Sequence, residues 1–434
     1  MSAKQTQHVV NAFIIKIVIM KYRSILLFLT LSVSHMALAG HSTIAPNIKS
    51  LEVVKGDDWM ALPVLEMGTS DVLYIGFDEL SHNYHRFVYR VEPCNPDWTA
   101  VDGLFESDWL EGFNNQPIDD YENSLNTNVL YTHYQFQLPN EQTRLKLSGN
   151  YRLYIDDEDN GNETVAIVEF RIVEPLMNVG IGVTTNTDVD FNRSHQQVAM
   201  TVNYNSVKVT NLDDQIQTIV MQNGREDNMK ANVRPNFITT QSLRWEHNRS
   251  LIFEAGNEYH KFEVLDPTHT TMGLASVSWD EAQRRFHAVP YPAEQRRSYI
   301  YDEDANGAFV LRNSDNYEAE RTSEYVFVHY KLMAPQPYDN ARVVVNGRWT
   351  TEPTDNYTME YNHQDHSYNL TLLQKLGYYN YQLLLVDRDG TTHRVPEEGS
   401  FFQTENSYQA FVYYRGTGER TWRLVGFQEV TYRP

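Results

Sequence analysis

Apolar and polar residues alternate with a period of two in short runs along most of this chain. Clear examples occupy residues 72–76, 87–91, 134–138, 151–155 and 343–345. Successive side chains of an extended strand point to opposite faces, so this spacing is typical of half-buried strands. Asp-Gly and Asn-Gly pairs between such runs supply the positive φ angles that tight hairpins require. The pattern predicts an all-β protein built from serial β-sandwich domains.

The amino terminus carries a different pattern, which is typical of an export signal. After Met20 come two basic residues, an apolar run at 25–33, and the small-residue sequence Ala37-Leu38-Ala39 before Gly40. A basic start, a short apolar stretch and small residues at a cleavage point indicate a secretory signal peptide. We therefore expect residues 1–39 to be a leader with its true start at Met20, and the mature protein to be exported.

Polar stretches divide the remaining chain into three expected units. The segment 182–194 follows a predicted strand at 166–173, and the segment 312–321 separates predicted strands at 308–311 and 325–332. These seams place an N-terminal sandwich at 40–176, a middle sandwich at 177–314 and a C-terminal sandwich at 315–434. The last unit contains Gly347-Arg348-Trp349 and Gly377-Tyr378-Tyr379-Asn380-Tyr381. It resembles early-set immunoglobulin-like domains, which include starch- and glycogen-binding modules.

Charge and cysteine content narrow the classes of function. The chain has 57 acidic and 36 basic side chains and a formal net charge of −21. That balance argues against nucleic acid or an anionic membrane surface as a partner, because both attract basic faces. The single cysteine, Cys94, excludes an internal disulfide, and we expect it to be packed as a small hydrophobe.

No constellation in the sequence indicates catalysis, a cofactor or a metal. Asp302, Asp304, Asn306 and Gly307 match the first half of a calcium loop, but the twelfth position is Asn313 rather than a glutamate. A solvated acidic hairpin is the favoured interpretation there, as it is for the four acids at 156–159. We name no catalytic, cofactor-binding or metal-ligating residue and expect a protein that is not an enzyme.

An ordered set of short motifs resembles the type IX secretion system plug protein family of the Bacteroidota. The match runs from about residue 73 to residue 414 and includes Cys-Asn-Pro-Asp-Trp, Ser-Gly-Asn-Tyr and Gly-Tyr-Tyr-Asn-Tyr. The positions that carry it are Cys94, Asn95, Asp97, Trp98, Tyr121, Asn126, Thr127, Tyr131, Gly149, Asn150, Tyr151, Gln222, Asn223, Gly224, Asn257, Glu258, Gly377, Tyr379, Asn380 and Tyr381.

The resemblance implies a periplasmic plug subunit. Such a subunit closes the channel of the outer-membrane translocon barrel, its protein partner, when no cargo is bound, and it has no small-molecule substrate. The alternative is an exported carbohydrate-binding or accessory sandwich protein, because Trp59, Trp98, Trp109 and Trp349 could stack on sugar rings. A hydrolase that uses a carboxylate pair is a third and weaker hypothesis.

Overall fold

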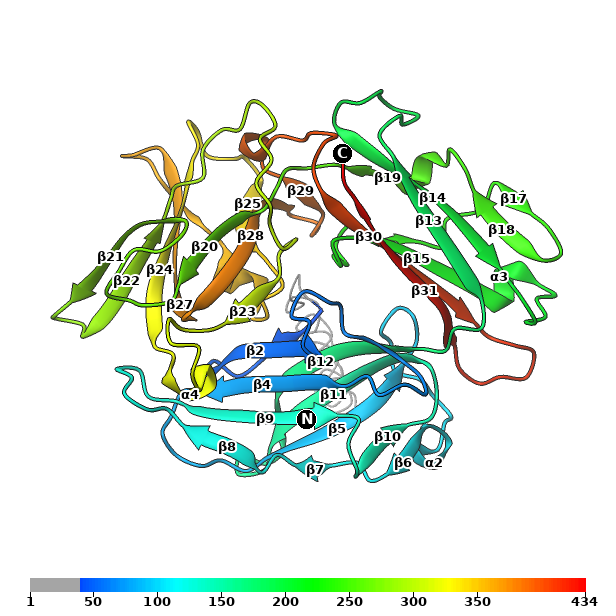
Figure 1. The fold of residues 1–434 in the computed structure, drawn as a ribbon, viewed down its shortest axis with the longest axis horizontal. Coiled ribbons are helices and arrows are strands. Elements are labelled where there is room, and N and C mark those ends of the chain that lie inside the picture. Colours follow the sequence, from blue (N-terminus) through cyan, green and yellow to red (C-terminus); the bar gives the residue numbers. More distant parts are fainter. Residues whose placement is uncertain (1–39) are drawn as a thin grey trace, which may run out of the picture.

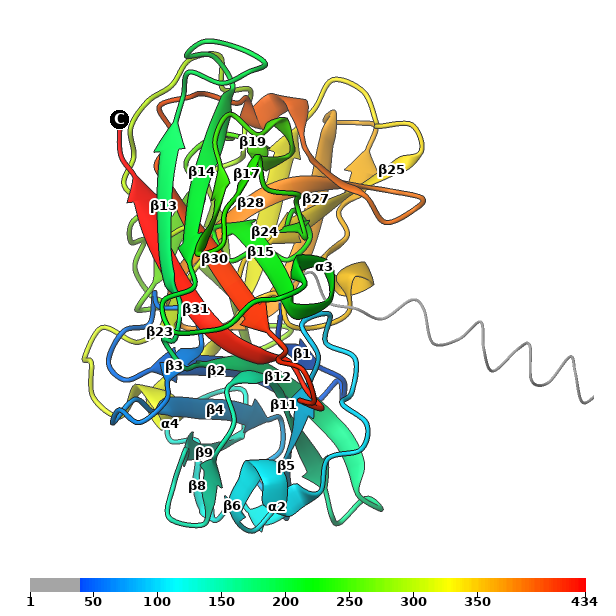
Figure 2. The same ribbon diagram turned by 90° about the vertical axis from the view of Figure 1, so that its right-hand side faces the viewer.

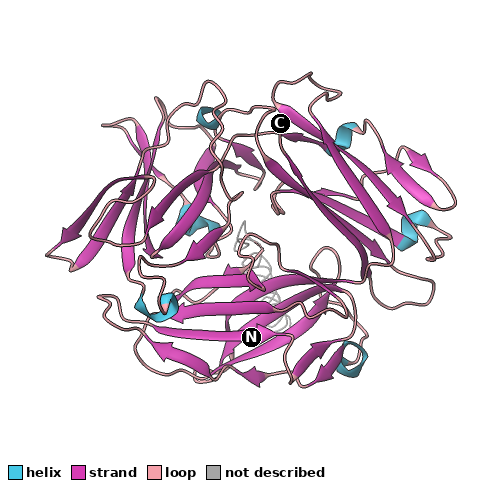
Figure 3. Ribbon diagram, viewed as in Figure 1, coloured by secondary structure: helices cyan, strands magenta, loops and turns pink. Residues whose placement is uncertain are grey.

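The computed structural model describes residues 40–434, and strands dominate it (Figure 3). The described helices are single turns, far too short and polar to cross a membrane. They are α2 (Glu106–Trp109), α3 (Leu212–Gln215), α4 (Ala319–Thr322), η1 (Arg249–Leu251), η2 (Thr354–Tyr357) and η3 (Pro396–Glu398). The prediction of an all-β sandwich protein is confirmed. The predicted signal peptide lies outside the described residues.

Residues 40–175 form the N-terminal sandwich. One sheet has the order β1-β12-β11-β5-β7, with β3 beside β12, and the other has the order β2-β4-β9-β8, while β6 and β10 pair separately. Alternate positions point between the two sheets, so Phe77, Leu153 and Phe170 are fully buried there. The strands are β1 (Ser42–Thr43), β2 (Ile48–Lys55), β3 (Val64–Glu66), β4 (Leu73–Glu79), β5 (Phe87–Cys94), β6 (Leu110–Gly112), β7 (Gln116–Pro117), β8 (Asp120–Asn123), β9 (Thr132–Leu138), β10 (Thr143–Leu145), β11 (Gly149–Asp157) and β12 (Glu163–Val173).

The middle sandwich combines residues 176–255 with residues 404–434. Its sheets have the orders β13-β14-β18-β17, with β19 beside β14, and β16-β15-β30-β31. Val202, Leu243 and Val412 lie at the centre of its core. The strands are β13 (Asn178–Thr184), β14 (His195–Asn203), β15 (Ile216–Gln222), β16 (Lys230–Ala231), β17 (Phe237–Ile238), β18 (Ser242–Trp245), β19 (Ile252–Glu254), β30 (Asn406–Tyr414) and β31 (Arg423–Tyr432).

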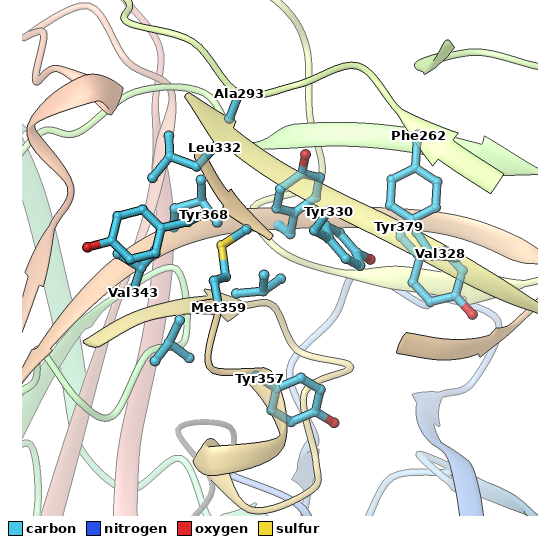
Figure 4. Close-up of a cluster of buried hydrophobic side chains, with 14 of the residues drawn as sticks. Phe262, Ala293, Val328, Tyr330, Leu332, Val343, Tyr357, Met359, Tyr368 and Tyr379 are labelled. Carbon is cyan, nitrogen blue, oxygen red and sulfur yellow. The ribbon is translucent and has the colours of Figure 1, made fainter. Parts of the chain in front are cut away.

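Residues 256–403 form the inserted sandwich. One sheet has the order β21-β22-β24-β27-β26, and the other is built around β28, which pairs with β20, β23, β25 and β29. Figure 4 shows its aromatic core, in which Tyr330 and Tyr379 lie among aliphatic side chains. The strands are β20 (His260–Val264), β21 (Leu274–Asp280), β22 (Arg285–Pro290), β23 (Phe309–Leu311), β24 (Tyr325–Met333), β25 (Ala341–Asn346), β26 (Glu360–Asn362), β27 (Ser367–Lys375), β28 (Gly377–Asp387) and β29 (Thr392–Arg394).

The strand pairing differs from the expected boundary between residues 314 and 315. β23 and β24 lie on either side of that boundary, and both belong to the inserted sandwich. β30 and β31, expected in a C-terminal unit at 315–434, instead complete the sheet of β15. The physical reason is backbone pairing, because the buried strand β15 has only the two-residue β16 on its other edge, and β30 supplies a full-length partner from nearly 200 residues away. The third sandwich is thus an insertion within the second.

The three sandwiches are arranged in a triangle. Figure 1 shows the N-terminal sandwich below, the inserted sandwich at upper left and the middle sandwich at upper right, around a shared centre. In the view of Figure 2, β31 runs down from the middle sandwich to the edge of the N-terminal sandwich beside β12. Each sandwich therefore has two neighbours, and three junctions hold the molecule together.

Candidate functional site: the junctions between the sandwiches

A buried ion pair lies between the N-terminal and inserted sandwiches. Asp78 at the end of β4 accepts a hydrogen bond of 2.6 Å from Nζ of Lys375, and both side chains are fully buried. Tyr325 donates a bond of 2.7 Å to the same carboxylate oxygen, and Nδ1 of His133 lies 2.7 Å from the other. Burial alone would raise the pKa of Asp78, but Lys375 and His133 outweigh burial and hold that pKa below its usual range.

Backbone and aromatic contacts extend this first junction. The Lys375 ammonium lies 4.2 Å from the centre of the Tyr131 ring, whose hydroxyl donates to the Ser323 carbonyl oxygen. The Glu324 carboxylate accepts bonds from the backbone N–H groups of Asn128 and Val129. Charges from both sandwiches are thereby satisfied only when the two are in contact, so separating them would leave buried groups without partners.

The second junction joins the N-terminal and middle sandwiches around Glu226. This carboxylate accepts bonds of 3.0 Å from Nε1 of Trp98 and 2.6 Å from Nη2 of Arg171. The Arg171 guanidinium also lies 4.7 Å from the centres of the Trp98 and Phe411 rings. An apolar cluster shared by both sandwiches surrounds these groups: Val64, Val173, Ile219, Met221, Phe411, Tyr413, Trp422 and Leu424.

Asn150 makes a further bond across the second junction. Its side-chain oxygen accepts a bond of 2.7 Å from the Tyr413 hydroxyl, and its amide group points toward the Asn95 carbonyl oxygen at 3.3 Å. The turn that contains Cys94 and Trp98 is thus tied to β30 through one amide side chain. Cys94 itself is buried, and burial raises the pKa of its thiol to about 11, so it is packed rather than reactive.

The third junction lies where the chain leaves the middle sandwich near residue 256 and returns near residue 404. Fully buried Gln196 donates to the carbonyl oxygens of Phe402 and Thr404 at 2.9 and 2.8 Å. Asn406 donates to Gln196 at 3.0 Å and receives a bond of 2.8 Å from Asn223. Asn257 donates to the Glu398 carbonyl oxygen at 2.8 Å. Amide side chains therefore satisfy the backbone of both crossing segments, which lack strand partners.

All three sandwiches meet at a central cavity of about 80 Å³. His41 and Arg171 reach it from the N-terminal sandwich, Glu226 from the middle sandwich and Arg348 from the inserted one. Burial, with the nearby charges of Arg171 and Arg348, lowers the pKa of His41 to about 4, so this imidazole is neutral at pH 7.

The structure brings many of the sequence-derived positions to these junctions. Trp98, Asn150 and Tyr131 contact a neighbouring sandwich directly. Gln222, Asn223, Asn257 and Glu258 lie around the chain crossing, Gly224 lies against Leu62, and Gly149 lies beside the backbone of Trp422.

Other positions lie away from the junctions. Tyr121 is exposed and stacks on Tyr134, and Thr127 donates to the Val129 carbonyl oxygen within its own turn. Asn126 is an exposed turn residue with positive φ. The rest serve local packing or turns in their own sandwich: Asn95, Asp97, Tyr151, Gly377, Tyr379, Asn380 and Tyr381.

Several junction residues were missed at the sequence level. Asp78, Lys375, Arg171 and Glu226 are charged, and a charged residue in an alternating strand is usually assigned to the solvent face. The available signal is that Asp78 and Arg171 adjoin apolar residues on both strand faces, which indicates burial on either side. A similar correction applies at 156–159, where Asp156 is buried and accepts bonds from Arg90 and Thr164 rather than being solvated.

The described residues offer little that resembles a catalytic or metal site. Within residues 40–434, no group of three His, Cys, Asp or Glu side chains is placed to hold a metal ion. Ser194, His195 and Asp190 are adjacent, but Ser194 and Asp190 both contact the same ring nitrogen, Nδ1 of His195. A nucleophilic triad needs the serine and the acid on opposite nitrogens of the imidazole.

The tryptophans proposed for sugar stacking are mostly packed inside the protein. Trp98, Trp109 and Trp349 are buried, and Nε1 of Trp349 donates to the Asn380 carbonyl oxygen at 2.8 Å. The Trp349 ring packs among Tyr330, Tyr357 and Tyr379 in the core of the inserted sandwich. These rings present no open face to a sugar, so they give the carbohydrate-binding alternative no support.

Comparisons with known proteins identify the family. The model of the type 9 secretion system plug protein 1st domain matches residues 48–174, which is most of the N-terminal sandwich. The crystal structure of a hypothetical protein from Parabacteroides merdae is 32% identical, with a TM-score of 0.86 over 92% of this chain and 100% of that one. A partial N-terminal region of an enterococcal surface protein, at 6% identity and a TM-score of 0.17, carries no argument. No curated protein matches the chain. The chain belongs to the type IX secretion system plug protein family.

Proposed function

We propose that this protein is a periplasmic plug subunit that closes the outer-membrane translocon channel of the type IX secretion system when no cargo is bound. The family places the protein in the context of this secretion system. The proposed partner is the translocon barrel, and the proposed location is the periplasm, reached by means of the signal peptide. The protein acts by occupying space and binding another protein, so it is not an enzyme.

The closed triangle of sandwiches is the observation that carries this proposal. A wide channel can be sealed only by a body that keeps its shape under thermal motion. Because each sandwich packs on both others, bending at one junction would strain the other two. The buried pair Asp78–Lys375, the Glu226 contacts and the Gln196–Asn406 amides each resist separation. Such a body is stiffer than three sandwiches joined only by linkers.

Co-purification and membrane leak test the proposal. We expect the protein to purify with the outer-membrane barrel from native membranes, and we expect its deletion to increase entry of a large, normally excluded antibiotic. Recovery of the protein only in free soluble form, with antibiotic entry unchanged after deletion, would contradict the proposal.

A matched pair of variants separates the role of the junctions from that of the surface. Lys375→Met removes the buried ion pair with Asp78, whereas Lys331→Met removes the partly exposed pair with Asp365. Complementing the deletion strain with each, at equal protein levels on immunoblots, should restore the barrier with Lys331→Met and restore it incompletely with Lys375→Met. Equal restoration by both would show that junction rigidity is not what closes the channel.

A further inference from the structure

The first residue after the predicted leader lies at the central cavity. Gly40 and His41 both line this cavity, together with Glu169, Arg171, Glu226 and Arg348. His41 is fixed there because its Nδ1 accepts a hydrogen bond of 3.1 Å from the backbone N–H of Glu169. Two residues later, the backbone N–H of Thr43 donates to the Thr351 carbonyl oxygen at 2.8 Å. The start of the described chain is thus held between the N-terminal and inserted sandwiches.

The two oxygens of the Glu169 carboxylate have different surroundings. Oε1 accepts bonds of 2.8 and 2.7 Å from the Arg152 guanidinium. Oε2 faces Gly40, since a methyl group placed on the Gly40 α-carbon would lie 3.6 Å from it. The Gly40 nitrogen is one bond of about 1.5 Å from that α-carbon. Rotation about the bond between the α-carbon and the carbonyl carbon of Gly40 can move this nitrogen to the place of that methyl group, within the 4 Å that an ion pair spans.

We propose that removal of residues 1–39 creates an α-ammonium group on Gly40 that forms an ion pair with Glu169 in the central cavity. The inference rests on the proposed export. Water hydrolyses the Ala39–Gly40 amide bond, leaving a carboxylate on Ala39 and an ammonium on Gly40. A chain that still carries its leader has a neutral amide nitrogen at Gly40, so it lacks this pair.

The charges around Glu169 favour an added cation. Burial, and next the charge of Glu226, raise the pKa of Glu169 to about 7, although Arg152 and Arg171 act in the opposite direction. Arg171 is itself paired with Glu226 at 2.6 Å. His41 is neutral. Burial and the Glu226 charge thus outweigh the nearby arginines. An ammonium beside Oε2 would stabilise the ionised form of Glu169.

The consequence is a link between processing and the final stability of the folded protein. The Gly40–Glu169 pair would fasten β1 onto the cavity where all three sandwiches meet. The triangle would then reach its full stability only after the leader is cut off, which happens on the far side of the inner membrane.

Thermal unfolding of purified chains with defined starts tests the inference. A fusion protein cut to begin at Gly40 is compared with one that keeps two extra residues and begins at Leu38. At pH 7 we expect the Gly40 chain to unfold about 2 °C higher, which is the size of effect that one ion pair produces in a protein of this size. The difference should disappear in Glu169→Gln. It should persist in the control Glu163→Gln, whose side chain is exposed on the same strand.

The pH dependence of this difference in melting temperature distinguishes an ion pair from a packing effect, because packing alone does not titrate. Pairing raises the pKa of the α-amine above its ordinary value of about 8. Because the pair also needs the ionised Glu169 carboxylate, the extra stability of the Gly40 chain is largest near pH 7 to 8, declines at lower pH as Glu169 is protonated, and is lost as the pH rises through the raised pKa of the α-amine. The neighbouring guanidinium groups of Arg152, Arg171 and Arg348 keep their charge over this range.

Three results would overturn the inference: equal melting temperatures for the two starts, a difference that survives Glu169→Gln, or mass spectrometry of the exported protein showing a start other than Gly40. The translocon takes no part in these measurements. Their failure therefore leaves the plug proposal standing, and failure of the leak assay leaves the ion pair standing.

Discussion

At the scale of single residues, the side chains that hold this molecule together are polar and buried. Lys375 is a clear example. Its ammonium is fully buried and is stabilised by the Asp78 carboxylate and the Tyr131 ring. Replacing one partner of a buried ion pair leaves the other charge without compensation, which costs several kcal/mol. Such a residue stabilises the fold mainly because its removal would leave a buried charge without a partner.

We expect Lys375→Met to lower the free energy of unfolding by about 3–5 kcal/mol, because Asp78 would remain buried without its ammonium partner. Urea denaturation followed by circular dichroism measures this loss. The control is Lys331→Met, which breaks a partly exposed pair with Asp365 and should cost no more than about 1 kcal/mol. Similar losses in both variants would show that the buried pair has no special weight.

Glu52 gives a prediction for pH. Burial raises its pKa to about 7, although a hydrogen bond from the Leu311 backbone and the charge of Lys375 act against burial. The folded protein thus holds this proton more tightly than the unfolded chain does, so the stability from Glu52 is present at low pH and is lost as the pH rises from about 4.5 to about 7. We expect Glu52→Gln to remove this loss, and to be more stable than the wild type at pH 8 by on the order of 1 kcal/mol. Chemical denaturation at pH 5 and pH 8 measures the free energy of unfolding of both proteins. An equal change between these pH values in wild type and variant would contradict the prediction.

At the scale of elements, the strands were predictable and their partners were not. The alternating runs at 134–138 and 151–155 lie within β9 and β11, and the run at 72–76 lies in β4 except for its first residue. Alternation indicates that one face of a strand is buried, but it does not say against which other strand. β30 pairs with β15 from a distance in sequence that no local pattern encodes. Fold class thus follows from periodicity alone, whereas the nesting of one sandwich inside another depends on long-range pairing.

The candidate site was likewise predictable from the sequence only in part. Motif positions such as Trp98, Asn150 and Asn257 came from resemblance, and their place at the junctions emerged only once the sandwiches were assembled. Asp78 and Arg171 escaped notice because each finds its counter-charge far away in the sequence. A lone charge in a strand has no local sign of the partner that makes its burial possible.

The turn after β15 offers a test at this scale. Gly224 has a φ of 68°, and a β-carbon there would lie 2.6 Å from Cδ2 of Leu62 in the N-terminal sandwich. We expect Gly224→Ala to destabilise the protein by about 2–3 kcal/mol, through both backbone strain and overlap. Gly161→Ala is the control, since its φ is 72° but no atom lies within 4 Å, and it should cost only about 1 kcal/mol. Partial rescue of Gly224→Ala by Leu62→Ala would assign the difference to the contact.

The insertion makes a prediction about fragments. Residues 177–314 would fold if the expected middle unit were autonomous, but they lack β30 and β31, which complete the sheet of β15. We expect this fragment to be unfolded or aggregated by circular dichroism and proton NMR, and residues 176–434 to be folded. A well-dispersed spectrum from the shorter fragment would show that the middle sandwich does not need its carboxyl-terminal strands.

At the scale of the whole molecule, the important property is that the three junctions form a closed ring. In a linear array, each sandwich can unfold without disturbing more than its immediate neighbours. In a ring, unfolding of any one removes contacts from both others, including the apolar cluster around Phe411 and the buried pair at Asp78. Mutual support of this kind raises cooperativity, which suits the proposed role of sealing a channel.

The ring therefore predicts one unfolding transition for the whole protein. Urea curves followed by tryptophan fluorescence and by far-ultraviolet circular dichroism should coincide, since the tryptophans lie in all three sandwiches. Opening the junction between the N-terminal and middle sandwiches with Arg171→Ala and Glu226→Ala together should split the curves, because the N-terminal sandwich then loses one of its two supports. As the control, Arg244→Ala and Glu246→Ala remove an exposed ion pair within one sandwich and should leave a single transition. If the wild type already unfolds in separate steps, the sandwiches are independent, and the stiffness that the proposed function requires must come from the proposed translocon partner.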